Sequence, residues 1–167
     1  MYITSKSKPG GREFSRTTMR ALIALLYLGY PAGCILRLTG GDDPTGRAMS
    51  LVGTLLILIA AAAFFAIGAS SLQRIMQDRE SALDEREISI RRKAHERAYP
   101  TFAGLALLGL MYMELGDDLA SRKGVAIWRP TEGDHWNALF WAALFLSLTL
   151  PAAYEAFSGR GDDPEAD

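Results

Sequence analysis

Residues 49–72 decide the fold of this chain: they read MSLVGTLLILIAAAAFFAIGASSL, 24 positions without one charged side chain. At about 1.5 Å per residue, a helix of this length extends about 36 Å and crosses a hydrocarbon layer about 30 Å thick with some tilt. A helix that is apolar on every face belongs in lipid or in a very large core, which 167 residues cannot build. The sequence therefore predicts a polytopic membrane protein.

Three further apolar segments predict spans at about residues 20–38, 100–115 and 136–157. Pro31 lies in the first of these and Pro151 in the last, and we expect each proline to bend its helix. The expected fold is all-α, a four-transmembrane-helix bundle over residues 19–157, with an amphipathic cytoplasmic helix between spans two and three. A polar N-terminus, residues 1–18, precedes it, and the acidic residues 158–167 are expected to be disordered.

Lysine and arginine residues concentrate in alternate connections of this bundle. The segment before the first span carries five of them, and the connection between spans two and three carries seven. The third connection carries three, which weakens the asymmetry without reversing it. Because positively charged segments stay in the cytoplasm, we expect both termini and the long middle connection to be cytoplasmic.

Residues 73–99, the middle connection, contain neither glycine nor proline and predict the amphipathic helix. Ser81 and Asp84 fit the Ser-x-x-Asp capping pattern, which indicates that a helix begins after Ser81. Its apolar residues recur at intervals of seven, a spacing typical of a packed helix. The candidate partner-docking residues are this apolar seam and the basic residues beside it: Met76, Leu83, Ile90, Arg91, Arg92 and Lys93.

The seam has four possible neighbours: the third span, a second copy of the chain, a partner protein, or the membrane surface. Ala94 and Ala98 continue it toward the third span. The basic residues beside it also suit anionic lipid headgroups. We therefore expect the lipid bilayer as one partner, and either a homo-oligomer or an unidentified protein as another.

A motif in this helix resembles one in a group of bacterial proteins. The run Leu83-Asp84-Glu85-Arg86-Glu87, followed by Ile90, Ala94 and Ala98-Tyr99 before a span, resembles a segment of about twenty residues in small uncharacterised bacterial membrane proteins. In those proteins a "DER" motif on a cytoplasmic helix precedes a transmembrane hairpin. The resemblance implies a multi-pass protein of the bacterial inner (plasma) membrane and no particular chemistry.

The densest acidic cluster lies near the outer end of the third span. Glu114, Asp117 and Asp118 share a helical face if the helix continues, and His135 follows across the connection. Such ligands suit a divalent cation, although acidic residues beside a membrane are more often simply solvated. We expect no resident metal and no cofactor, with these four residues as the weak candidates for a metal site.

Small residues in the spans predict sites of close helix packing. Ala62, Ala66 and Ser70 repeat every four positions in the second span, and Gly104 and Gly109 lie in the third. They fit packing within one bundle, or between two copies.

Cys34 is the only cysteine, so the chain has no internal disulfide. It follows an apolar run, as in a lipoprotein signal, but Pro31 departs from that pattern at the third position before it. The apolar run also continues beyond Cys34, which favours an uncleaved span.

Composition and motifs narrow the possible functions. The net charge of −1 argues against a nucleic-acid binder. The spans carry almost no ionisable residues, which argues against a proton pump or an ion-coupled transporter. No nucleotide-binding loop and no HExxH or GxSxG motif occurs, so we do not expect an enzyme. The first hypothesis is a protein that docks a partner, the second an oligomeric transporter or channel subunit, and the third a metal-dependent membrane enzyme.

Overall fold

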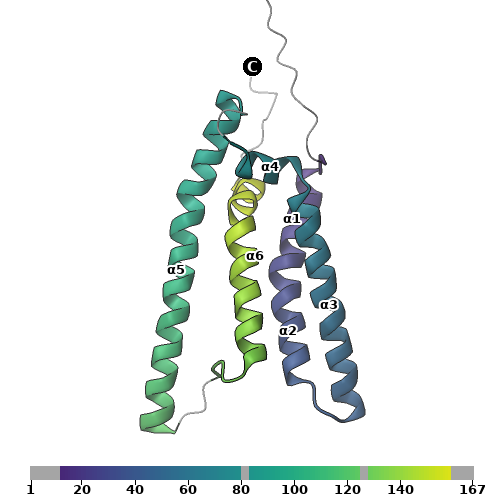
Figure 1. Ribbon diagram of the computed structural model, residues 1–167, viewed down its shortest axis with the longest axis vertical. Helices are drawn as coiled ribbons and strands as arrows, with labels where there is room; N and C mark the ends of the chain where they lie inside the picture. The colour runs from purple at the N-terminus through teal and green to yellow at the C-terminus, as the bar shows by residue number, and fades with distance from the viewer. Residues whose placement is uncertain (1–11, 80–82, 125–127, 159–167) are drawn as a thin grey trace, which may run out of the picture.

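The computed structural model describes residues 12–79, 83–124 and 128–158, and these residues form a helical bundle (Figure 1). In chain order the elements are α1 Arg16–Ala24, η1 Leu25–Gly29, α2 Tyr30–Thr39, α3 Pro44–Gly68, α4 Ser71–Gln77, α5 Glu85–Lys123 and α6 Gly133–Ser158. The tail was predicted to be residues 158–167, but Ser158 is the last residue of α6. Residues 159–167 and the first eleven residues lie outside the described part.

Four helical segments are long and apolar enough to cross a membrane, as expected, and the fold is consistent with a multi-pass membrane protein. They are Arg16–Thr39, Pro44–Gly68, Glu85–Arg122 and Gly133–Phe157. Figure 1 shows them running up and down. We call the end that holds α4, the start of α1 and the end of α6 the α4 end, and the opposite end the loop end.

The first span changes its hydrogen-bond pattern before its proline. Leu25–Gly29, η1, is one turn of π-helix, and Pro31 lies in the first turn of α2. Pro31 has no N–H to donate to the carbonyl four residues back, so a wider turn at this point relieves the mismatch. The structure therefore shows a π-helical turn beside Pro31 inside a continuous helical segment, and the expected bend at Pro31 stays a prediction.

Glycine residues bring α2 and α3 into close contact. A Cβ atom on Gly33 would lie 2.7 Å from the carbonyl oxygen of Gly53, and one on Gly53 would lie 2.6 Å from that of Gly33. No larger residue fits either position at this helix separation. Close approach through small residues is the main source of helix association in lipid, where apolar surface alone gives no preference for protein over lipid.

The α4 end is closed by short polar contacts. Arg12 pairs with the corner between α3 and α4, because its N–H donates to Ala69 O at 2.8 Å and its carbonyl accepts from Ser71 N at 3.2 Å. The Arg20 Nε atom donates to Ala156 O at 2.7 Å, which ties α1 to the end of α6. A core cluster that includes Ile23, Leu26 and Ile67 lies beneath these contacts.

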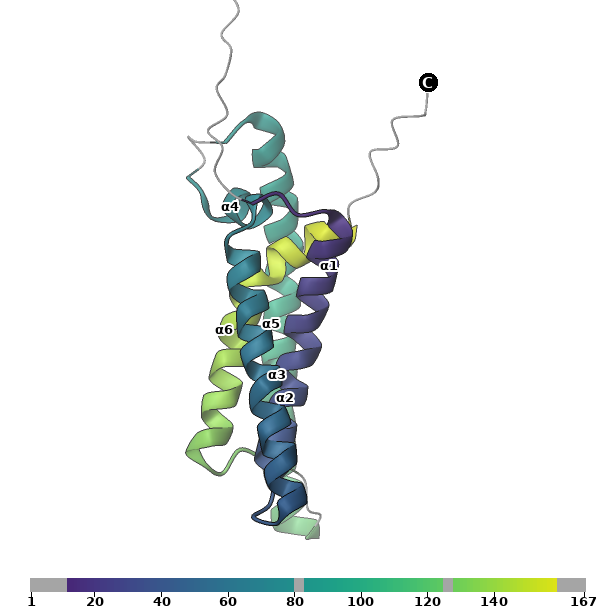
Figure 2. The same ribbon diagram turned by 90° about the vertical axis from the view of Figure 1, so that its right-hand side faces the viewer.

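Pro151 marks a bend in α6, as predicted. Figure 2 shows the last turns of α6, in yellow, leaning toward α1. The bend places Ala153 and Ala156 in the core cluster with Met19 and Ile23. Two hydrogen bonds hold α6 below the bend: Tyr27 Oη lies 3.0 Å from Thr149 Oγ1, and Gln73 Nε2 donates to Leu148 O at 2.8 Å.

The connection between the second and third spans differs from the prediction. The second span ends at Gly68, and the separate helix α4 occupies Ser71–Gln77. The expected cytoplasmic helix at 73–99 is not a unit of its own, because its second half is the first third of the 39-residue helix α5. Asp84 caps that helix, so the predicted start after Ser81 is wrong by three residues, and Ser81 itself lies outside the described residues.

Candidate docking surface on the first turns of α5

A capping box fixes the first turn of α5. Asp84 Oδ1 accepts from Glu87 N at 2.7 Å, and Glu87 Oε2 accepts from Asp84 N at 3.2 Å. Each side chain thereby satisfies a backbone N–H that the helix start leaves without a partner. Proline at position 100 lies inside α5 without ending it. The first turns of α5 are therefore part of the same helix as the third apolar segment.

Charged contacts tie this turn to α4. Arg74 lies 3.2 Å from Asp78 Oδ2 and 3.5 Å from Glu87 Oε1, and Arg91 Nη1 donates to the carbonyl of Asp78. Arg74 and Glu87 are each about a quarter to a third exposed, so these contacts are partly shielded from solvent. Arg91, predicted to face a partner, instead holds the end of α4.

The apolar seam packs inside the chain. Met76, Ala94 and Ala152 form one buried cluster, with Ile90 packed against it. Ala94 is fully buried, which leaves no room for a larger residue between α5 and α6. The prediction that Met76 and Ile90 present a free docking surface is therefore wrong for these two residues. The observed neighbours of the α5 seam are α4 and the fourth span, α6, and neither was among the four neighbours expected from the sequence.

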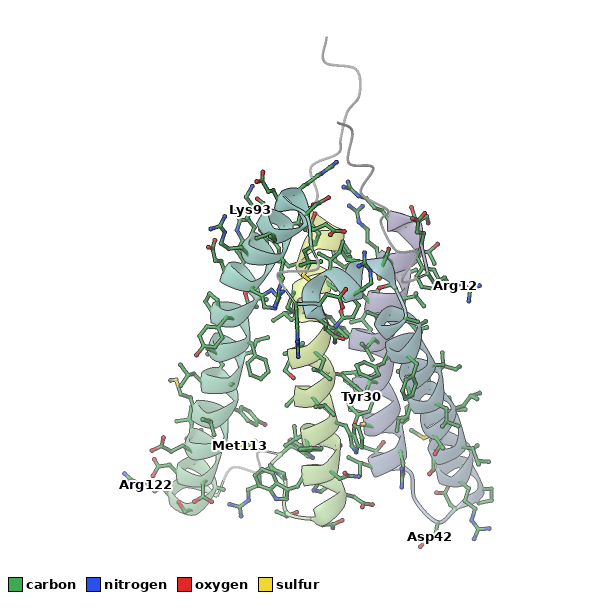
Figure 3. All side chains as sticks on the ribbon, turned by 45° about the horizontal axis from the view of Figure 1, so that its top comes forward. Arg12, Tyr30, Asp42, Lys93, Met113 and Arg122 are labelled. Atoms are coloured by element: carbon green, nitrogen blue, oxygen red, sulfur yellow. The ribbon has the colours of Figure 1, made fainter. Side chains whose placement is uncertain are left out.

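The opposite face of the same turns is open. Glu85, Arg92, Glu96 and Tyr99 follow one another along that face at helical spacing, and all four are exposed. Lys93 lies beside them at the α4 end, as Figure 3 shows. Within the described residues, Arg92, Lys93 and Glu96 form no ion pair. We call these five residues the charged ridge.

Leu83 lies just before the helix and is half-buried, but it is not part of the buried cluster. His95 is exposed, and its Nδ1 lies 2.9 Å from the carbonyl of Arg91. Arg97 lies over the ring of Tyr154 at 5.1 Å, a cation–π contact that joins α5 to the end of α6. The ridge is therefore flanked on one side by contacts that fix its orientation.

Three of the four candidate metal ligands at the loop end have other partners. Asp117 is paired with Arg129, and Asp118 with Arg122. The His135 ring accepts hydrogen bonds from the backbone at Thr131 and Glu132, at 3.2 and 3.3 Å. Among the described residues, no three His, Cys, Asp or Glu side chains are placed to share a cation. Asp117, Asp118 and His135 thus each have a separate arginine or backbone partner, and Glu114 lies on the same surface of α5 as the two aspartates.

The predicted small-residue ridge of the second span does not pack as one face within the bundle, and its packing between two copies stays a prediction. Ala62 is exposed and Ala66 half-buried, whereas Ala60 and Ala63 are buried. Ser70 lies beyond the span, where its Oγ caps α4 by accepting from Gln73 N at 3.1 Å. The close contact between α2 and α3 occurs instead at Gly33 and Gly53, which we call the glycine seam. Gly29-x-x-x-Gly33 is a GxxxG motif that signals this seam in the sequence.

Gly104 and Gly109 also lack the predicted close neighbour. A Cβ atom added to either would meet nothing within 4 Å. Their span, α5, is the least covered of the four: 6% of its most apolar stretch is buried, against 22–33% for the others. Within the described residues, nothing packs closely against these two glycines.

No family model, no curated protein and no solved structure matches this chain. Function therefore has to be inferred from the chain's own geometry. Its most distinctive features are the charged ridge at the α4 end and the poorly covered α5.

Proposed function

We propose that this chain is a non-enzymatic protein of the bacterial inner membrane, and that the charged ridge of α5 docks a protein partner in the cytoplasm. The lysine and arginine distribution supports placing the α4 end and both termini on the cytoplasmic side. The bacterial origin rests on the resemblance of the DER segment.

One observation carries the proposal: α5 is a single helix whose first turns are buried on one face and bare on the other. Its 39 residues extend about 58 Å, well beyond a hydrocarbon layer about 30 Å thick. A solvated connector between two spans needs neither a capping box nor a buried seam. Here both hold the ridge in one orientation, and preorganisation of this kind lowers the entropic cost of binding.

The ridge also has the charge pattern of a specific contact. Arg92 and Glu96 place opposite charges four residues apart, and Tyr99 adds an exposed aromatic ring, a residue type enriched at interfaces. Charges at an interface contribute mainly to association rate and to the choice of partner. Reversing them should therefore weaken capture of the partner without unfolding the bundle.

Photo-crosslinking in native membranes tests the proposal, with the probe amino acid at Glu96. We expect one distinct partner, whose yield falls when Arg92 and Lys93 are both changed to Glu. The matched control is Arg47→Glu, which reverses an exposed charge at the loop end. A yield that does not respond to reversal of the ridge charges, or responds equally to the control, would refute docking through the ridge.

A second candidate function is that of a small transporter or channel subunit that acts as an oligomer. The poor coverage of α5 and the open Gly104 and Gly109 favour it. In a Cys34→Ala background, a cysteine at Gly109 should then form disulfide-linked dimers on oxidation. A cysteine at Ala62, exposed on α3, is the matched control. Equal dimer yields from the two positions would indicate random collision and exclude a specific α5 interface.

A further inference from the structure

A cavity of about 370 Å³ lies between α2, α3 and α6. Its lining on α2 and α6 is in the half of each span toward the loop end, and its lining on α3 is at residues 57–65, past the middle of that helix. Its body is apolar and aromatic, with walls that include Phe64, Phe65, Trp141 and Phe145. Its polar lining groups are few, and three of them come from residues near helix ends: Arg37, Asp134 and Asn137. A concave apolar site with a few polar groups at one end is the usual form of a binding site for an amphiphile.

Along α6, the length of the cavity is close to the thickness of one leaflet of a bilayer. Along α6 it extends from Asp134, in the first turn, to Phe145, eleven residues later. That separation is about 16 Å of helix, roughly half of a hydrocarbon layer about 30 Å thick. This inference rests on the placement of the four spans across a membrane. It does not depend on the charged ridge, which lies at the other end of the molecule.

The cavity has two charged lining residues near helix ends. Their charges are opposite, and they do not form a salt bridge with each other. Arg37 and Asp134 both line the cavity, and within the described residues neither takes part in a salt bridge. A ligand that brings only a negative group would leave the Asp134 carboxylate facing it. A ligand that carries an anionic and a cationic group complements both side chains.

We propose that this cavity binds one zwitterionic phospholipid with a phosphoethanolamine headgroup, taken from the leaflet at the loop end. The guanidinium of Arg37 binds the phosphate, a pairing for which its planar fork of donors is suited. The Asp134 carboxylate accepts hydrogen bonds from the primary ammonium, and one acyl chain occupies the aromatic body. A quaternary ammonium has no N–H to donate, so phosphocholine lacks this second contact.

Retention of lipid by the purified full-length chain tests the proposal. The chain is placed in bilayer nanodiscs with equal amounts of phosphatidylethanolamine, phosphatidylglycerol and phosphatidylcholine. It is then released in mild detergent, and the lipid bound per chain is measured by native mass spectrometry. We expect one retained lipid, predominantly phosphatidylethanolamine.

Two charge variants separate the headgroup contacts. Arg37→Gln should lower retention of every phospholipid about threefold to fivefold, the range expected for a partly exposed charge pair. Asp134→Asn should remove the preference for phosphatidylethanolamine over phosphatidylglycerol. Both residues are exposed, so neither substitution threatens the fold. The matched controls are Arg47→Gln and Asp42→Asn, exposed at the same end and outside the cavity lining.

A third variant fills the cavity body. Ala61→Phe adds a ring at a lining position and should abolish retention of all three lipids, whereas Ala62→Phe, exposed one residue further along α3, should not. Retained lipid in the 1:1:1 ratio of the nanodisc would overturn the proposal and indicate ordinary surrounding lipid. Preference for phosphatidylcholine would overturn the ammonium contact, and equal losses in the controls would overturn the site.

Discussion

The glycine seam between α2 and α3 gives the sharpest test of how this bundle is held together. A Cβ atom at Gly53 would lie 2.6 Å from Gly33 O and 2.7 Å from Arg37 N, whereas ordinary contact begins at 3.4 Å. Gly53→Ala therefore forces backbone apart by about 0.8 Å, or distorts the helices locally. Overpacking of this kind costs about 1–3 kcal/mol, and the better helix propensity of alanine returns up to about 1 kcal/mol.

The net expectation for Gly53→Ala is a loss of about 1–2 kcal/mol of folding free energy. For a chain of this size that corresponds to a fall in Tm of roughly 2–8 °C. Gly104→Ala is the matched control, because a Cβ atom there meets nothing within 4 Å. It should gain helix propensity without a clash and leave Tm unchanged or raised by a few degrees, about 1–3 °C.

Cys34 provides the assay. It is the only cysteine, it lies next to Gly33 on α2, and it is half-buried. A maleimide dye that becomes fluorescent on reaction with thiols therefore reports thermal opening of α2 in detergent. If Gly53→Ala melts at or above the temperature of Gly104→Ala, close backbone contact is not what holds α2 to α3.

Three further predictions concern the contacts around α5 and α6. Asp84→Ala removes the capping box and should cost about 1 kcal/mol, seen as faster hydrogen exchange of the first amides of α5. Ala94→Leu inserts a larger side chain where no space remains and should cost about 1–3 kcal/mol in thermal unfolding, while Lys93→Ala, exposed beside it, changes stability by less than about 0.5 kcal/mol. A double-mutant cycle of Tyr27→Phe and Thr149→Val should give a coupling near 0.6 kcal/mol, and a coupling of zero would show that this hydrogen bond adds nothing.

Hydropathy predicted the membrane-spanning character of the chain because that property depends on composition over about twenty residues. It placed in order the four helices that are long and apolar enough to cross a membrane, and Pro151 marks a bend as expected. The ends of the helices were less predictable. Polar residues can continue a helix beyond the lipid, so the third span, predicted at 100–115, is only the middle of Glu85–Lys123.

Periodicity identified the apolar seam but could not name its neighbour. Ile90 and Ala94 share a face of α5 whether that face meets α6, a second copy or another protein. The deciding element is Ala152, which the bend at Pro151 brings against the seam. That contact joins residues far apart in the chain, so no local pattern reports it. As a result the sequence pointed to the buried face as the docking surface, and the structure leaves the opposite face open.

The same reasoning explains why the packing faces within the spans were predicted poorly. In water, burial of apolar residues marks the inner face of a helix, but in lipid every apolar face is equally well solvated. Which face of a helix packs against its neighbours then depends on the shapes of the two surfaces. The informative residues are glycines, because the lack of a side chain lets two helices come into contact. Gly33 and Gly53 satisfy that condition because each would clash with the other's carbonyl, whereas Gly104 and Gly109 do not. A glycine in a span is therefore evidence of packing only when its partner glycine is also known, and that knowledge comes from the fold.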